Sequence, residues 1–145
     1  MSTAVLEAKN AKNFDDKNYD IKLQIINNAT EKQRINNFII KIAKSEDEQE
    51  RGLMFIDYLP KNYGMLFKFE EEKIINMWMK NTKISLDMIF IDGKGIIKKI
   101  VANTKPNSLE IISSDFFVDK VLEINGGLCA KLNIAVGNYI KYKYQ

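Results

Sequence analysis

The residues best suited to chemistry in this chain are a few polar side chains inside an otherwise apolar stretch. Arg51, Asn81, Thr82 and Asp87 interrupt a run of large apolar residues, and Glu123 interrupts a later apolar segment. A strand that only fills a core has no use for such residues, because a buried polar group needs a partner. The pattern therefore predicts a small polar cluster held by the loops of a buried sheet.

Arg51 has two interpretations. A guanidinium can grip a carboxylate through two parallel hydrogen bonds, and Asp87 and Glu123 are the candidate partners. In the first interpretation this ion pair only locks a helix to the sheet. In the second, Arg51 joins Asn81 and Thr82 in a site for an anion or a carboxyl group.

Asn81 and Thr82 are equally open to two interpretations. Both side-chain types commonly bond to nearby backbone groups in turns, which would make them structural. Alternatively they point into a cleft beside Trp78, since an apolar cleft with a few convergent polar groups is the usual form of a small-molecule site.

Two further chemistries are weaker candidates. Asp87 could activate water as a general base if it is desolvated, which would make the protein a hydrolase, but no second titratable group is evidently tuned against it. Met77 and Met79 are soft ligands that suit Cu(I) and would share one face of a strand. Methionine also fills core gaps, so a metal site is not the leading interpretation.

Composition excludes several functional classes. Histidine is absent, which removes Ser/His/Asp and Cys/His nucleophile systems and every zinc site that needs imidazole. The single cysteine, Cys129, cannot form an internal disulfide and sits between Leu128 and Ala130 as a small apolar residue would. We expect no cofactor and lean against an enzyme.

The charge pattern argues against a nucleic-acid partner. The net charge is +3, and the lysines are scattered among apolar residues rather than clustered. Binding to a nucleic-acid backbone needs several cations converging on one groove, so we interpret these lysines as the solvated faces of strands. No apolar run is long enough to span a membrane.

The chain divides into a polar tail and one domain. Residues 1–18 show little apolar periodicity, so we expect a mobile tail there and a single domain over residues 19–145. The tail lacks the apolar centre of a signal peptide. If a leader has been removed, we expect the cell envelope or secretion, and otherwise the cytoplasm.

Alternating residues predict strands at 19–25 and around Phe38 to Ile42. Ser45 and Glu48 form a capping-box pattern, which predicts a short helix over about 46–55. A strand begins at Met65, residues 70–73 form a charged connection, and the apolar residues 74–79 predict a central strand.

The second half continues the β pattern. Residues 86–91 and 96–101 should form strands joined by a tight turn at 92–95, where Asp-Gly supplies positive φ angles. Further strands are expected at 118–124 and from Tyr139 onward, with one helical turn at 128–132. The prediction is an α+β, β-rich domain whose antiparallel sheet curls into a barrel or half-barrel with one or two short helices.

Several of these segments resemble one known group of proteins. The matching motifs are RGLM at 51–54, GMLF at 64–67, WMKNT at 78–82, LDMIFID at 86–92 and VLEINGG at 121–127. They are similar to the signature of the domain-of-unknown-function family numbered 192, which comprises small uncharacterised bacterial and archaeal proteins. The resemblance covers about residues 36–145, with Met77 standing where the family usually has Phe.

The resemblance implies a compact β-rich α+β domain, often in a secreted or envelope protein, and it implies no established reaction. The functional hypothesis is therefore a non-catalytic binding module for a small anionic or carboxyl-bearing ligand or a peptide. We expect the ligand to lie near Arg51, Trp78, Asn81, Thr82, Asp87 and Glu123. Three alternatives remain: a hydrolase based on Asp87, a Cu(I)-binding envelope protein based on Met77 and Met79, and a purely structural role in which all these residues serve folding alone.

Overall fold

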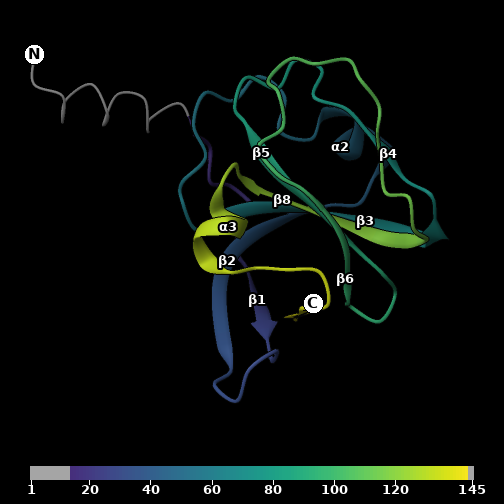
Figure 1. Cartoon of the computed structure of the whole chain (residues 1–145). Helices are drawn as coiled ribbons and strands as arrows, with labels where there is room; N and C mark the ends of the chain where they lie inside the picture. The colour runs from purple at the N-terminus through teal and green to yellow at the C-terminus, as the bar shows by residue number, and fades with distance from the viewer. Residues whose placement is uncertain (1–13, 144–145) are drawn as a thin grey trace, which may run out of the picture.

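The computed structural model describes residues 14–143, and its centre is a strongly curled sheet of seven strands (Figure 1). The spatial order of these strands is β6-β5-β8-β3-β2-β1-β9. Only the β2–β3 pair is parallel, and the other five pairings are antiparallel. The strands are β1 (Ile21–Asn27), β2 (Arg34–Ala43), β3 (Tyr63–Lys73), β5 (Leu86–Ile91), β6 (Ile97–Val101), β8 (Val118–Asn125) and β9 (Tyr139–Tyr142).

The two outer strands of the sheet meet at one end. Ile96, just before β6, forms a bridge with Tyr139, and the Ile97 amide donates to the Asn138 carbonyl. The Ile140 amide donates to the Gly95 carbonyl. These bonds join the two ends of the half-barrel and satisfy backbone groups that an open sheet edge would leave exposed. The predicted fold class is confirmed.

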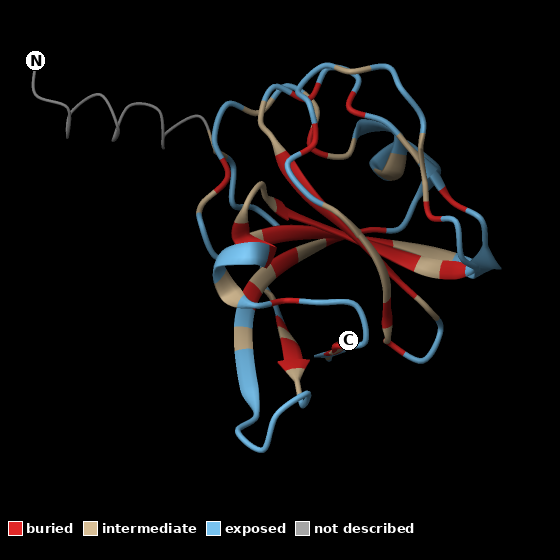
Figure 2. Cartoon of the chain, in the orientation of Figure 1, coloured by how far each residue is buried: buried red, intermediate tan, exposed pale blue. Residues whose placement is uncertain are grey.

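Both faces of the sheet are covered, so the molecule has two cores (Figure 2). All six residues of β5 are buried. Because side chains alternate along a strand, Ile89 and Ile91 enter one core and Met88 and Phe90 enter the other. The first core is closed by α3 (Leu128–Leu132) and β9, and the second by segments around Leu53 and Met79.

Helix α2 (Glu46–Arg51) has the predicted capping box. The Glu48 amide donates to the Ser45 hydroxyl at 3.1 Å, and the Ser45 amide donates to the Glu48 carboxylate at 3.0 Å. The helix ends earlier than the predicted residue 55, because Gly52 adopts a φ of 48° that leaves the helical region. Residues 52–55 form turns instead, which places Arg51 in the last helical position.

The segment from residue 70 to residue 79 differs from the prediction. Residues 70–73 continue β3 rather than forming a connection. The predicted central strand at 74–79 is reduced to β4 (Asn76–Met77), which pairs with β7 (Ile112–Ser113) in a separate small sheet. Ile74 and Trp78 are exposed, so the apolar run is explained by a surface ribbon whose alternate residues Ile75 and Met79 reach the core.

The turn at 92–95 and the helical turn at 128–132 are confirmed. The Asp92 carbonyl accepts from the Gly95 amide, and α3 has the predicted bounds. Neither helix within residues 14–143 combines the length and the apolar character needed to cross a membrane.

Most of the expected tail lies outside the described residues. In its described end, the Phe14 ring lies 5.1 Å from the Tyr19 ring and 5.4 Å from the Tyr63 ring, centroid to centroid. The polar tail and the boundary at residue 19 stay predictions.

Candidate functional site

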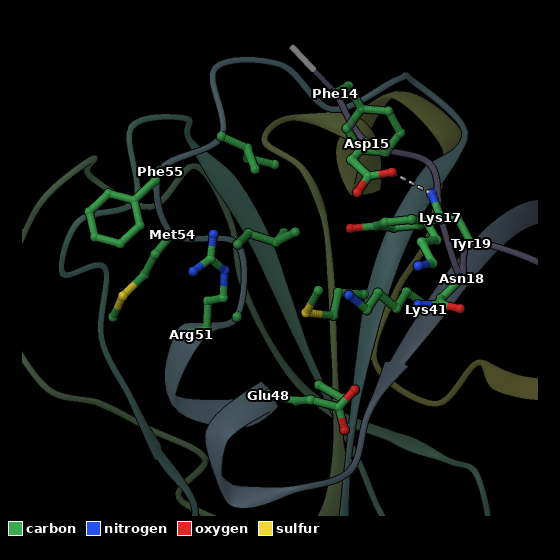
Figure 3. A pocket seen from close by; sticks show the side chains of 15 residues that line it. Phe14, Asp15, Lys17, Asn18, Tyr19, Lys41, Glu48, Arg51, Met54 and Phe55 are labelled. Atoms are coloured by element: carbon green, nitrogen blue, oxygen red, sulfur yellow. Dashed lines mark hydrogen bonds between the residues drawn. The ribbon is translucent and has the colours of Figure 1, made fainter. Parts of the chain in front are cut away.

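A cavity of about 330 Å³ lies between α2 and the start of the sheet, and we call it the cationic cavity (Figure 3). The Tyr19 hydroxyl and the Lys41 ammonium extend into it from the β1–β2 side, and Arg51 faces them from the end of α2. None of these three groups has a hydrogen-bond or ion-pair partner among residues 14–143. Three donors from separate segments thus converge on one space.

The acidic residues of this cavity are already engaged. Asp15 accepts from the Lys17 amide at 3.0 Å, and Glu48 accepts from the Ser45 amide in the capping box. The hydrogen bonds from Ser45 lower the pKa of Glu48. Burial, with a smaller effect of Glu123 and Asp15, raises the pKa of Tyr19 to about 12, so its hydroxyl stays a donor at neutral pH.

Arg51 does not form the predicted ion pair with Asp87 or with Glu123. Its guanidinium carbon lies 5.9 Å from the centroid of the Phe55 ring, a cation–π contact, and the residue is exposed. This corrects the locking interpretation. Helix α2 ends at Arg51 and presents the side chain at the surface, whereas both carboxyl groups lie inside the sheet.

A second cavity, of about 360 Å³, adjoins the first, and we call it the Glu123 cavity. The segment from Arg51 to Met54 lines both cavities. On the other side the Glu123 cavity is bounded by Asn76, Trp78 and Lys80. Its remaining lining residues are Glu46, Gln49, Glu50, Phe67, Phe69, Met77, Thr82 and Glu123.

Glu123 is the unusual residue of this cavity. It lies in β8 between Met65 of β3 and Met88 of β5, and only 4% of its surface is exposed. Its carboxyl group forms no hydrogen bond or ion pair with any residue of the described chain. Burial alone raises its pKa to about 8, so the group is mostly protonated at neutral pH.

Trp78 and Thr82 line the same cavity. Trp78 is 41% exposed, and the Lys80 ammonium lies 5.1 Å from its ring centroid. The Thr82 hydroxyl donates to the Lys80 carbonyl at 3.1 Å, which is the turn bond expected in the structural interpretation, although its oxygen keeps acceptor capacity. Met77 is half-buried in the lining, whereas Met79 is buried in the core.

Asp87 is held in a different place. Its Oδ1 accepts from the amides of Asn103 and Gly127, each at 2.9 Å, and its Oδ2 accepts from the Cys129 amide at 2.8 Å. Gly127 caps α3 without a side chain, so Asp87 supplies the missing cap from another strand. Asp87 is fully buried and lines neither cavity.

Asn81 also lies apart from the cavities. It adopts a φ of 54°, and its carbonyl accepts from the Phe55 amide at 2.9 Å. The structure therefore brings Arg51, Trp78, Thr82 and Glu123 together and leaves Asn81 and Asp87 outside.

Sequence reasoning missed Tyr19 and Lys41. Both lie in segments that alternate like half-buried strands, a pattern that groups Tyr19 with apolar neighbours on one strand face and Lys41 with the solvated lysines. The only available signal was that Lys41 stands between two buried residues, Ile40 and Ile42.

Cys129 is buried, as expected for a small apolar residue, and burial followed by the nearby Asp87 raises the pKa of its thiol. Within residues 14–143, no three His, Cys, Asp or Glu side chains are grouped as metal ligands would be.

A third concavity, of about 1210 Å³, collects lysines that the sequence pattern suggested were scattered. Its lining includes Lys22, Lys94, Lys120, Lys141 and Lys143. The Lys120 ammonium donates to the Asp92 carbonyl at 3.1 Å and pairs with Asp119 at 2.7 Å. The absence of a nucleic-acid partner stays a prediction.

The fold and these cavities define a curled β-rich α+β domain with two adjoining cavities at the end of a short helix. The model of the family DUF192, described as an uncharacterized ACR, matches residues 17–142. The chain belongs to this family, which confirms the resemblance found in its motifs.

Two solved structures are similar to this chain. A Sinorhizobium meliloti protein, provisionally described as a transcription regulator, is 34% identical, with a TM-score of 0.80 over 84% of this chain and 92% of that one. A Novosphingobium aromaticivorans protein of unknown function is 31% identical, with a TM-score of 0.78 over 83% of this chain and 84% of that one. No curated protein matches this chain significantly.

Proposed function

We propose that this protein is a non-catalytic binding module whose ligand carries a carboxylate, either on a small molecule or at the end of a peptide. The observation that carries this proposal is the convergence on the cationic cavity of three donors that form no hydrogen bond or ion pair within residues 14–143, Tyr19, Lys41 and Arg51, although Arg51 contacts the Phe55 ring and Lys41 acts on Glu48 electrostatically. A carboxylate satisfies such a set, because charge-assisted hydrogen bonds from a guanidinium and an ammonium are stronger than neutral ones.

The local structure supports this assignment. The capping box fixes α2, and the helix ends at Arg51, so the guanidinium is presented at the mouth of both cavities. The carboxylates of Asp15 and Glu48 already accept backbone amides, which lowers their competition for the three donors.

The same geometry favours binding over hydrolysis. A general base needs free access to water and substrate, whereas Asp87 is buried and bonded to three amides. The Cu(I) alternative gains no support, since Met79 packs in the core while Met77 lines the Glu123 cavity.

The test is calorimetric titration with 3-phenylpropionate and its neutral amide. We expect binding of the carboxylate, weakened about tenfold or more by Arg51→Gln and less by Lys41→Gln or Tyr19→Phe. Arg34→Gln, which removes an exposed guanidinium outside both cavities, is the matched control and should leave the affinity unchanged. Equal binding of the acid and the amide, or an unchanged affinity in Arg51→Gln, would show the proposal to be wrong.

A further inference from the structure

The Glu123 cavity narrows the class of ligand, and this step rests on the proposed function. We infer that the ligand is an amino acid, with its carboxylate in the cationic cavity and its ammonium group against Glu123. The cationic cavity would bind the carboxylate of the ligand, and the adjoining Glu123 cavity would bind its ammonium group.

The two cavities are close enough to hold one small molecule. The segment from Arg51 to Met54 lines both of them. Met65 lines the cationic cavity, and Glu123 is its direct neighbour on the next strand. Because residues directly opposite in a ladder share a face of the sheet, the Glu123 side chain starts beside the Met65 side chain.

The described residues supply no hydrogen-bond or ion-pair partner for the Glu123 carboxyl group. A buried carboxyl group without a hydrogen bond carries a large desolvation cost. The charged or titratable groups around it are Tyr19, Glu46, Glu50, Arg51 and Lys80, and none of them bonds to it. Arg51 and Lys80 instead contact the aromatic rings of Phe55 and Trp78. A ligand ammonium would be the first partner of this carboxyl group.

The rest of the cavity indicates the kind of side chain. Phe67, Phe69 and Trp78 provide aromatic surface, and Met54 and Met77 provide adaptable apolar surface. Trp78 is partly exposed at the mouth, where a ligand can cover it. We therefore expect an apolar or aromatic amino acid.

Binding should also move a proton. Free Glu123 has a pKa near 8 because of burial, whereas an adjacent ammonium favours the ionised carboxylate. Below about pH 8, binding of an amino acid therefore releases the Glu123 proton, and the affinity rises with pH. A ligand that has a carboxylate but no ammonium releases no such proton.

The experiment uses the full chain and the standard amino acids, screened by thermal shift near pH 7.5. The most stabilising amino acid is then compared by calorimetry with its deamino acid and its decarboxylated amine. We expect the amino acid to bind about tenfold tighter than either analogue. Its affinity should rise between about pH 6 and pH 8, and buffers of different ionisation enthalpy should reveal the released proton.

Glu123→Gln is the diagnostic variant, and Glu70→Gln, on the exposed end of β3, is its control. The diagnostic variant should bind the amino acid and the deamino acid equally and release no proton, while the control behaves as the unaltered protein. If Glu123→Gln fails to fold, Glu123→Asp takes its place. This variant keeps a carboxyl group and should retain part of the preference for the amino acid over the deamino acid.

The other outcomes separate the two proposals. If the deamino acid binds as tightly as the amino acid and depends on Arg51, the carboxylate module stands and the amino-acid inference is wrong. If the amine alone binds as tightly and Arg51→Gln has no effect, both are wrong. If no standard amino acid stabilises the protein while 3-phenylpropionate binds, only the present inference is overturned.

Discussion

Two buried carboxyl groups on neighbouring strands have opposite surroundings. Asp87 of β5 lies opposite Ile124, and Glu123 of β8 lies opposite Met88, so their side chains enter the two different cores. Asp87 accepts three backbone amides. Glu123 has no hydrogen-bond partner within the described part of the chain.

The difference separates a structural carboxyl group from a candidate binding group. Asp87 compensates its burial by holding the start of α3 against the sheet, so its position is explained by the fold alone. Glu123 has no partner within residues 14–143, yet no fully enclosed side-chain oxygen there lacks a partner, so its carboxyl oxygens keep some contact with solvent and a ligand can reach them. A buried polar residue is therefore informative about function when its hydrogen bonds are missing.

The largest effect is expected at Asp87, the carboxyl group with a structural role. Asp87→Asn removes one acceptor oxygen and points an amide donor at backbone N–H groups that are buried. We expect a loss of about 3–4 kcal/mol of unfolding free energy, measured by urea denaturation. Asp115→Asn, at the exposed ion pair with Lys99, should leave the free energy of unfolding almost unchanged, because solvent screens the pair. A similarly small loss at Asp87 would contradict its role as the cap of α3.

The second prediction concerns the way in which Glu123 makes the free energy of unfolding depend on pH. Its folded pKa, about 8, exceeds its ordinary value of 4.5, so the unfolded chain ionises first as pH rises. The contribution of Glu123 to stability should therefore be greatest below about pH 4.5, fall as pH rises, and level off above about pH 8. In Glu123→Gln this fall should largely disappear, so that the variant is more stable than the unaltered protein at about pH 8.5.

Urea denaturation of both proteins at a series of pH values measures this dependence. Equal pH profiles for Glu123→Gln and the unaltered protein would mean that Glu123 already has a partner in solution.

The smallest effect concerns the helix that presents Arg51. Ser45→Ala removes the hydroxyl that accepts from the Glu48 amide, and we expect a loss of about 1 kcal/mol. Binding of 3-phenylpropionate should weaken at the same time, because α2 positions Arg51 between the two cavities. Asp47→Asn, in the same turn but outside the capping box and both cavities, is the control. If stability falls by about 1 kcal/mol while the affinity for 3-phenylpropionate stays unchanged, α2 does not position Arg51.

The sequence predicted the fold well where signals are local. The uninterrupted apolar residues of β5, the Asp-Gly turn after it and the Ser45–Glu48 capping box each depend on neighbours in the chain, and all were found in the structure. The run at 74–79 was misassigned, because apolar composition alone does not distinguish a central strand from a surface ribbon that alternates between core and solvent.

The candidate site was only partly predictable for the same reason. The structure places Arg51, Trp78, Thr82 and Glu123 around one cavity, and their role in binding stays a prediction. Asp87 finds its amide partners because of the register of β5 against β8 and the place where α3 begins. Neither feature is visible in the residue types. Lys41 lies opposite Met65 in the β2–β3 pairing, and Tyr19 precedes β1 and packs against Tyr63 of β3, so both reach the site through contacts that are distant in sequence.

The place of β9 in the sheet constrains how the protein is made. This strand pairs with β1, while its start bridges to the residue before β6, so the half-barrel is joined only after residue 139 has been synthesised. During synthesis β1 can pair only with β2, and its other edge waits until more than a hundred further residues have been translated. Nascent chains halted before residue 139 should therefore expose an unpaired edge of β1, which favours aggregation.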